Sequence, residues 1–517
     1  MLTMSSALDR ARRQQAGRTA VITPERTFSW AEHVERVARL AGCLKGLGLE
    51  PADHFGILSR NSFRQAELFH AGYWSGVIPV PVNVRLSPRE IAFVLKDSGC
   101  KHLVVEPPFM PLLDKEELAP WRDHVIPLDG PGAGYRSYED LIAGSSAVSR
   151  RDTHEDDDAI LIYTGGTTGR AKGVRLTHRN IVSNAMQVGL TLGIRPDDIY
   201  LHVAPMFHSA DLLGTVLTLT GGTHVYLPEF SPAAFLGAIQ SSQVTFTMLP
   251  PTMLMMVLQH PEFSQYDLSS LRIQVYGSSP MAQPWILRAL ESLPGVQVTQ
   301  GYGLTECSPI LSFLEHRHHL DAIATDNIGR LGSAGKILAG IDLRIVDEAG
   351  NDVVRGGSGE IVVRGPNNAP SYYLQPEANR EAFRAGWFHT GDIGREDDEG
   401  FLYLLDRKKD MIVTGGENVY SSEVESALYT HPGVAEAAVI AVPDEVYGER
   451  VFAVIVVKAG ITLTEADLIE HCRTHIGGYK IPRRFAFVDL LPKSALGKIL
   501  KSDLRKRFGT RNSSDPN

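Results

Sequence analysis

The stretch YTGGTTGRAKGV, from Tyr163 to Val174, decides the fold and the chemistry that this sequence predicts. The residues just before it, 159–162, are apolar and partly β-branched, which is typical of a buried strand. The glycines that follow let the backbone turn its N–H groups toward an anion, and the threonines add hydroxyl donors. Lys172 adds a positive charge. We therefore predict a loop that binds a polyphosphate, with a Gly/Thr-rich surface turn as the alternative.

This loop differs from the common nucleotide-binding pattern G-x-x-x-x-G-K-[ST]. Here Gly173 follows Lys172, and no glycine precedes the lysine. The sequence therefore predicts a different class of phosphate loop. The residues predicted to bind the phosphates are Thr164, Gly165, Gly166, Thr167, Thr168, Gly169 and Lys172.

Length and charge limit the class of protein. A chain of 517 residues exceeds what one hydrophobic core usually supports, so we expect two or more domains. The 51 basic and 60 acidic residues give a net charge of −9, which argues against a nucleic-acid-binding protein. The cysteines are far apart in sequence, and no stretch approaches the ~20 apolar residues of a membrane span. We expect a cytoplasmic monomer or homodimer without stable membrane insertion.

Short apolar runs alternate with helical patterns up to about residue 405, which indicates α/β layers. One example is the run 77–84, followed by a helical pattern over 87–99 in which Ser87 and Glu90 form a capping box. After the charged segment 406–410 a compact set of strands and helices is expected. There, Ser422 and Glu425 are predicted to form a second capping box, and 437–442 and 451–457 are predicted strands.

Four further strings carry a resemblance to a known family. They are GYGLTE at 301–306, WFHTGDIG at 387–394, DRKKDMIVTGGENVYSSEVE at 406–425 and PKSALGK at 492–498. In this order and spacing, together with the phosphate loop, the chain resembles AMP-forming acyl-CoA synthetases of the adenylate-forming superfamily, which also includes peptide-synthetase adenylation domains and luciferases.

The resemblance implies the domain organisation. It implies a large multi-subdomain N-terminal α/β domain over 1–405 that carries the ATP and acyl sites. A hinge follows at 406–410, and then a small mobile C-terminal α+β domain over 411–517 that carries the catalytic lysine.

The resemblance also implies a reaction in two halves. A carboxylate first attacks the α-phosphate of ATP, and the thiol of CoA then displaces AMP. Glu306 matches the family's Mg²⁺ ligand, with Thr164 a second contributor, and a hard cation with oxygen ligands is the expected metal. Thr305 matches a donor to the α-phosphate. Lys498 matches the cation that bridges the substrate carboxylate and the α-phosphate in the transition state.

Nucleotide recognition is implied at two places. Tyr302, between Gly301 and Gly303, resembles the residue that stacks on adenine, and a second adenine-lining segment is formed by Gly277, Ser278 and Ser279. Asp392 matches the carboxylate that accepts the ribose hydroxyls, and Arg407 a cation on the same sugar. A buried tyrosine and a salt-bridged aspartate are the structural alternatives.

The thioester half requires a domain rotation in the family. Lys409 matches the hinge position, whose backbone torsions absorb the motion. Gly415 and Gly416 match a pair that lets the thiol approach the carbonyl, and His208 matches a residue of the acyl pocket or CoA tunnel.

The substrate class follows from the position of His208. Relatives that activate amino acids have a carboxylate there, which pairs with the substrate's ammonium, so amino acids are disfavoured. The methionines of 245–258 suit an irregular acyl tail or, equally, a helix of the core. A medium- or long-chain fatty acid is the first choice and an aryl or arylpropenoic acid the second. An acyl-AMP ligase that loads a carrier protein instead of CoA is a further alternative.

The sequence departs from the family pattern at a few positions. Ala171 stands where proline is common before Lys172. Strings like SGGENVYPAEVE in relatives appear here as TGGENVYSSEVE, so that Ser421 replaces a proline. No charged or metal-binding group is lost by these changes.

Overall fold

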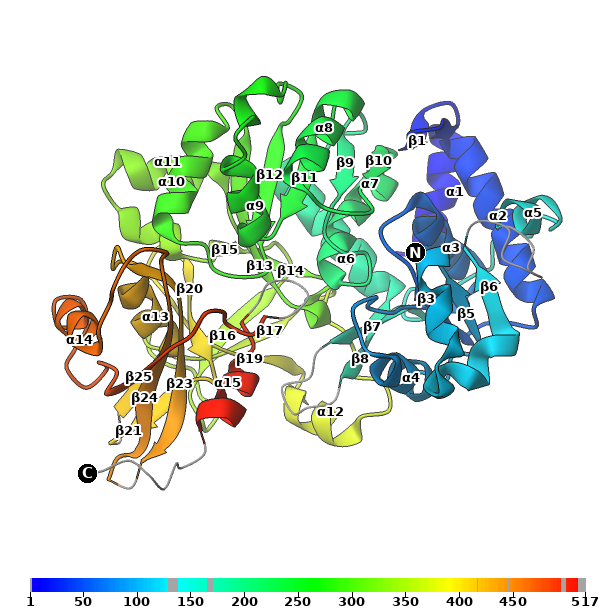
Figure 1. Ribbon diagram of the computed structural model, residues 1–517. Helices are drawn as coiled ribbons and strands as arrows, with labels where there is room; N and C mark the ends of the chain where they lie inside the picture. The colour runs from blue at the N-terminus through cyan, green and yellow to red at the C-terminus, as the bar shows by residue number, and fades with distance from the viewer. Residues whose placement is uncertain are drawn as a thin grey trace. The chain divides into compact units, whose positions relative to one another are not determined.

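The computed structural model describes residues 2–128, 138–164, 171–415, 417–444, 446–493 and 499–509. The chain divides into two compact units. Unit 1 contains residues 1–342 and 363–388, and unit 2 contains residues 343–362 and 389–517. Helices and sheets alternate through unit 1, as Figure 1 shows, so the predicted α/β class is confirmed.

The largest sheet of unit 1 has the strand order β15-β14-β13-β12-β11-β9-β10-β1-β2. Its inner strands, from β1 through β10, β9, β11 and β12 to β13, are parallel, and β2, β14 and β15 are antiparallel to their neighbours. The strands are β1 (Thr19–Ile22), β2 (Thr27–Ser29), β9 (Ile199–His202), β10 (Thr223–Tyr226), β11 (Phe246–Leu249), β12 (Ile273–Gly277), β13 (Gln297–Gly303), β14 (Ile310–Leu314) and β15 (Lys336–Ile337). The parallel order places the C-terminal ends of several strands at one edge, where ligands of α/β proteins bind.

Helices of unit 1 supply the apolar faces that cover its sheets. Phe235 of α8, Leu254 of α9 and Ile286 of α10 belong to one buried cluster with side chains of the large sheet. The helices are α1 (Met4–Gln14), α2 (Trp30–Gly46), α3 (Phe63–Ser75), α4 (Pro88–Asp97), α5 (Tyr138–Ala143), α6 (His178–Leu192), α7 (Thr215–Thr220), α8 (Pro232–Ser242), α9 (Pro251–Leu258), α10 (Gln283–Ser292), α11 (His316–Ala324) and α12 (Pro376–Ala382). Burial of these faces removes apolar surface from water and so stabilises the layers.

A second, parallel sheet of unit 1 has the order β4-β3-β5-β6. Its strands are β3 (His54–Leu58), β4 (Ile78–Pro81), β5 (His102–Val105) and β6 (Val125–Pro127). The predicted strand within 77–84 is therefore confirmed as β4, and the helix that follows it begins with the predicted capping box. Ser87 N donates to the carboxylate of Glu90 at 2.8 Å, and Ser87 Oγ accepts from Glu90 N.

The predicted strand before the phosphate loop is the first strand of a hairpin. Strand β7 (Asp158–Thr164) pairs with β8 (Lys172–Thr177) in antiparallel register. The other edge of β8 is held by 371–373, since Tyr373 N donates to Gly173 O at 2.7 Å and Arg175 N donates to Ser371 O. Residues 165–170 lie outside the described residues.

Unit 2 contains most of one five-stranded sheet and all of another. The first has the order β16-β17-β19-β18, with β20 also paired to β19, and the second has the order β22-β21-β24-β23, with β25 paired to β24. The first sheet consists of β16 (Asp342–Val346), β17 (Gly359–Arg364), β18 (Phe383–Arg384), β19 (Trp387–Glu396) and β20 (Leu402–Arg407). The second consists of β21 (Ile412–Thr414), β22 (Glu417–Val419), β23 (Val434–Asp444), β24 (Gly448–Val457) and β25 (Arg484–Phe487), with helices α13 (Ser421–Tyr429), α14 (Glu465–Arg473) and α15 (Lys501–Phe508). The two strands predicted after 410 are confirmed in β23 and β24.

The capping box predicted for Ser422 and Glu425 is wrong. Helix α13 begins at Ser421, two residues before the start that a cap at Ser422 requires, and Tyr420 precedes it without a side-chain cap. Ser422 Oγ donates to Leu405 O, and Glu425 accepts from Val439 N at 2.7 Å. Both side chains are used by contacts with distant strands, so the local cap is not formed.

The segment 406–410 lies inside unit 2 and not at the boundary between the units. The sequence assigns residues 389–405 to the N-terminal domain. In the structure they belong to unit 2 together with the C-terminal residues, and they form most of β19 and β20. The hinge is a statement about motion and stays a prediction.

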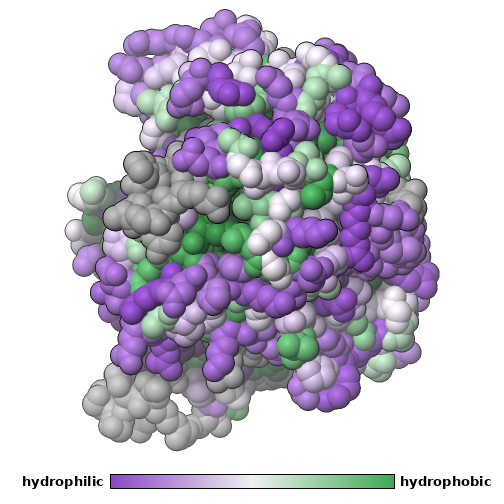
Figure 2. All heavy atoms as spheres, turned by 90° about the vertical axis from the view of Figure 1, so that its right-hand side faces the viewer, coloured by the Kyte–Doolittle hydropathy of each residue, from purple (hydrophilic) through white to green (hydrophobic). Residues whose placement is uncertain are grey.

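The surface is mainly hydrophilic, and the cysteines lie in the interior. On the face shown in Figure 2, hydrophilic residues cover most of the surface, with smaller hydrophobic areas between them. All four cysteines are buried. None of the helices in the described part of the chain combines the length and apolar character that crossing a membrane requires.

Candidate active site

Two residues of the predicted phosphate loop are described, and they lie where β7 ends and β8 begins. Thr164 and Lys172 are partners in the β7–β8 register, and both are half-buried. The Lys172 ammonium lies 5.1 Å from the centre of the Tyr372 ring. The hairpin therefore fixes a hydroxyl and a cation at the two ends of the loop. The predicted residues Gly165, Gly166, Thr167, Thr168 and Gly169 lie outside the described residues.

The predicted adenine segments are the ends of two adjacent parallel strands. Gly277 and Gly301 are partners in the β12–β13 register, and a Cβ atom on Gly277 would lie 2.3 Å from Gly301 O. A Cβ atom on Gly303 would lie 1.9 Å from Pro309 O. The protein's own backbone thus excludes a side chain at Gly277 and Gly303, a reason that the sequence did not reveal.

Tyr302 lies between the two glycines of β13 and is buried. The two serines after Gly277 form a bend in which Ser278 has a left-handed φ of 71°. Ser279 follows it and is half-buried. A buried tyrosine was the structural alternative for Tyr302, and its burial fits both interpretations.

Thr305 and Glu306 follow β13 in a short 3-10 helix, η5 (Thr305–Cys307), and both are buried. Thr305 Oγ1 lies 2.8 Å from Ser209 Oγ. One carboxylate oxygen of Glu306 accepts from Tyr372 Oη at 2.8 Å, and Glu306 O accepts from Ala369 N at 2.7 Å. Both predicted catalytic residues are therefore held by segments that are distant in sequence.

Tyr372 brings two predicted site residues together. Its hydroxyl bonds to Glu306, its ring faces Lys172, and its backbone bridges to Val174 of β8. Neither Tyr372 nor Ser209 was predicted from the sequence. The only local signal for Tyr372 is a pair of tyrosines in PNNAPSYYL, without a charged neighbour.

His208 precedes the 3-10 helix η3 (Ser209–Gly214) and caps it, since His208 Nδ1 accepts from Ala210 N at 3.2 Å. The acid of this turn, Asp211, is buried and lies 2.8 Å from His202 Nδ1. His202 Nε2 is 2.9 Å from His224 Nδ1. Burial holds the pKa of His224 well below its usual range, so this ring is neutral. The Asp211 carboxylate is thus already paired with a histidine.

The predicted ribose residues meet in unit 2. Asp392 and Arg407 are partners in the β19–β20 register, and their side chains form an ion pair at 2.7 Å. Thr390 Oγ1 accepts from Asp392 N. Asp392 is therefore salt-bridged, as the structural alternative expected. Its partner is Arg407, which the resemblance assigns to the same ribose.

The remaining predicted residues follow β20. Lys409 is exposed in a turn, and Gly415 is exposed with a φ of 60°, close to the Tyr447 ring. Gly416 and Lys498 lie outside the described residues.

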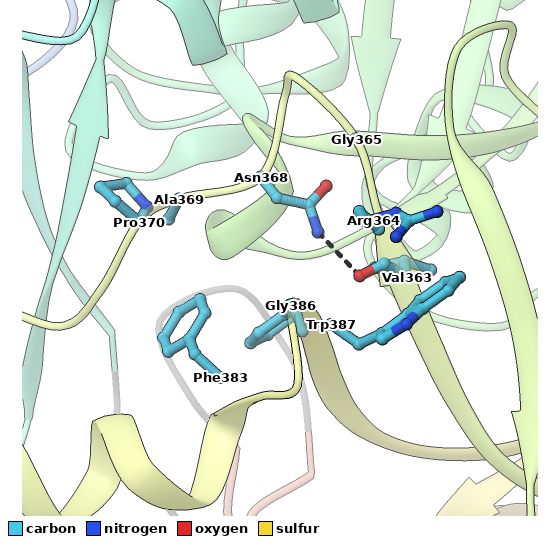
Figure 3. Close-up of a pocket in the computed structure, with 10 residues that line it drawn as sticks. Val363, Arg364, Gly365, Asn368, Ala369, Pro370, Phe383, Gly386 and Trp387 are labelled. Atoms are coloured by element: carbon cyan, nitrogen blue, oxygen red, sulfur yellow. Dashed lines mark hydrogen bonds between the residues drawn. The ribbon is translucent and has the colours of Figure 1, made fainter. Parts of the chain in front are cut away.

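A pocket beside the Tyr372 segment is lined by residues of unit 1 (Figure 3). Its volume is about 260 Å³. Arg364 lies 4.6 Å from the centre of the Trp387 ring, and Asn368 Nδ2 donates to Val363 O. Phe383 faces the same space (Figure 3). None of the predicted site residues lines this pocket.

Comparison with known proteins identifies relatives over nearly the whole chain. A family model described as AMP-binding enzyme matches residues 8–373, and one described as AMP-binding enzyme C-terminal domain matches residues 423–498. A feruloyl-CoA synthase of Amycolatopsis sp. is 37% identical over 493 residues, covering 95% of this chain and 96% of the relative. The long-chain-fatty-acid–CoA ligase FadD13 of Mycobacterium tuberculosis is 35% identical over 478 residues, covering 91% of both chains.

A solved structure gives the same result for the fold. The o-succinylbenzoate CoA synthetase MenE from Bacillus subtilis, in complex with its acyl-adenylate intermediate, superposes with a TM-score of 0.85 at 31% identity. The match covers 96% of this chain and 97% of the other. The predicted organisation into a large N-terminal and a small C-terminal domain is that of these proteins.

Proposed function

We propose that this chain, which belongs to the family of AMP-binding enzymes and is an AMP-forming acid–CoA ligase, activates an apolar acid that has no amino group. A medium- or long-chain fatty acid is the first candidate. The observation that carries the proposal is the pairing of Asp211 with His202 at 2.8 Å. With His208 at the position of the amino-acid-binding carboxylate and Asp211 already paired, this turn offers no carboxylate to a substrate ammonium.

In the first half-reaction the acid's carboxylate oxygen bonds to the α-phosphorus of ATP, and pyrophosphate leaves. Repulsion between the two anions must be offset by cations and hydrogen-bond donors. We assign Lys172 to the phosphates, Thr305 to the α-phosphate and Lys498 to the reacting oxygens. In the second half-reaction the thiol sulfur bonds to the acyl carbon, the thiol proton is lost, and AMP leaves.

The donor set at Glu306 fits Mg²⁺. The Glu306 carboxylate is buried and accepts a hydrogen bond from the Tyr372 hydroxyl, so oxygen atoms are available there, and a hard cation prefers oxygen ligands. No group of three or more His, Cys, Asp or Glu side chains able to hold a metal occurs among the described residues. Bound there, the cation would neutralise phosphate charge, with Glu306 and Thr164 as its protein ligands.

Tyr372→Phe is expected to raise the Mg²⁺ concentration for half-maximal acyl-AMP formation about tenfold, because a hydrogen bond to a charged group contributes ~1.5–3 kcal/mol. The variant removes only the hydroxyl that orients Glu306. Calorimetric titration of Mg²⁺ into enzyme with ATP should show the same weakening. Tyr373→Phe is the matched control, since Tyr373 packs against the His54 ring. Equal Mg²⁺ titrations of both variants would remove Tyr372 from the metal site.

An aryl or arylpropenoic acid is the second candidate. Two of the relatives support it, since the feruloyl-CoA synthase is 37% identical and an indoleacetate–CoA ligase of Aromatoleum aromaticum is 35% identical. The methionines that favoured a flexible acyl pocket give less support than expected. Met253 packs against the core of unit 1, and Met256 is 51% exposed.

A pyrophosphate-release assay tests the proposal with octanoic, palmitic, ferulic and indoleacetic acid and with phenylalanine. Each acid is assayed without acceptor, with CoA and with a holo-carrier protein. We expect turnover with an apolar acid and CoA, and none with phenylalanine. The preferred acid decides between the two candidates. Preference for phenylalanine would overturn the proposal on the substrate, and acyl transfer to the carrier but not to CoA would favour the acyl-AMP ligase.

A further inference from the structure

Ser421 connects the two sides of the predicted hinge. Asp406, at the end of β20, accepts hydrogen bonds from Ser421 N and, at 2.7 Å, from Ser421 Oγ. Ser421 Oγ accepts in turn from the Lys501 ammonium, which lies 2.7 Å from Glu425. The serine hydroxyl therefore donates once and accepts once, and Ser421 is fully buried. We call Asp406, Ser421, Lys501 and Glu425 the latch.

The residues on either side of Lys409 are held by different parts of unit 2. Before it, Arg407 pairs with Asp392 at 2.7 Å, and Lys408 pairs with Glu360 at 3.0 Å. After it, Asp410 pairs with Arg505 of α15. A rotation about Lys409 can leave these three pairs intact.

The contacts of the latch join residues on opposite sides of Lys409 in the chain. Asp406 precedes Lys409 in the chain, whereas Ser421, Glu425 and Lys501 follow it. The hydrogen bond from Ser422 Oγ to Leu405 O crosses Lys409 in the same way. Rotation about Lys409 must therefore break the bonds between Ser421 and Asp406. Burial raises the pKa of Asp406, and Lys501 opposes that rise.

The latch depends on both the N–H and the hydroxyl of Ser421. A proline at this position would have neither an N–H nor a hydroxyl to offer Asp406. Ser421 is the first residue of α13, and the preceding Tyr420 is extended with a ψ of 118°. Proline is favoured at the first helical position and after an extended residue. The helix therefore does not require serine, and the role of Ser421 is its contact with Asp406.

We propose that Ser421 is a positioning residue, which stabilises the observed orientation about Lys409 by binding Asp406 across the hinge. The inference rests on the proposed function in one respect, that the two half-reactions use different orientations. Loss of the latch shifts the population toward the other orientation. Ser421 then sets the balance between acyl-AMP formation and thioester formation.

Ser421→Pro tests the inference kinetically. Pyrophosphate exchange without CoA measures acyl-AMP formation, and conversion of supplied acyl-AMP with CoA measures thioester formation. We expect the ratio of the two rates to change by more than about tenfold, because two hydrogen bonds to a charged group are lost. Ser421→Ala, which keeps the N–H, should shift the ratio less and in the same direction. Ser502→Ala, an exposed serine of α15, is the matched control and should leave the ratio unchanged.

A distance measurement gives a second readout that does not depend on activity. Spin labels at Asp398→Cys and Glu470→Cys, both exposed, lie before and after Lys409, and the native cysteines are buried. Ser421→Pro should increase the population of a second distance. Rate ratios and distance distributions equal to wild type in both Ser421 variants would overturn the inference. Failure of the wild-type enzyme to form acyl-CoA would instead contradict the proposed function, and the distance measurement would still test the latch.

Discussion

Lys498→Ala is expected to reduce the rate of acyl-AMP formation at least about a hundredfold, because loss of a charged contact in the transition state costs on the order of 3 kcal/mol or more. Conversion of supplied acyl-AMP to acyl-CoA should stay near the wild-type rate. The assignment places the ammonium on oxygens that carry the developing charge only in the first half-reaction. Both half-reactions are measured separately on the same preparation.

Lys506→Ala is the matched control for this experiment. Lys506 lies on α15 with its side chain 78% exposed and pairs with Asp503. Its removal should leave both half-reactions unchanged and so exclude a general effect of lost basic charge. An equal loss of both half-reactions in Lys498→Ala would refute the adenylation role.

Lys409→Pro is expected to abolish thioester formation and to preserve acyl-AMP formation, the reverse of the Lys498 variant. Proline fixes φ near −65° and restricts the residue before it, so one orientation about the hinge is trapped. The neighbouring backbone bonds, from Lys408 N to Gly391 O and from Asp410 N to Arg407 O, do not use the nitrogen of Lys409. The proline should therefore restrict motion without removing either bond.

Lys409→Ala distinguishes the effect of the Lys409 backbone torsions from the effect of its side chain. It removes the exposed ammonium without restraining the torsions, and both half-reactions should persist. Normal acyl-CoA formation from acyl-AMP by the proline variant would mean that the pivot lies elsewhere or that rotation is not required. In that case the latch at Ser421 would lose its functional meaning even if its hydrogen bonds are present.

The sequence determined the features that depend on neighbouring residues. The apolar run before the phosphate loop became β7, and Ser87 with Glu90 capped α4 as predicted. Such features are decided by backbone conformation and by contacts within one turn, so the order of residues specifies them. The strings that carry the family resemblance likewise sufficed for the fold class and the reaction type.

The tertiary structure decided which side chains meet. Tyr372 is 66 residues from Glu306, and Ser209 is 96 residues from Thr305, so no local pattern could pair them. Serine at the start of α13 looked like a harmless replacement for proline, and its bonds to Asp406 appear only when β20 and α13 lie side by side. The predicted cap at Ser422 failed for the same reason. A side chain that can bond locally is taken by a distant strand when burial makes an unsatisfied polar group there more costly than a lost cap.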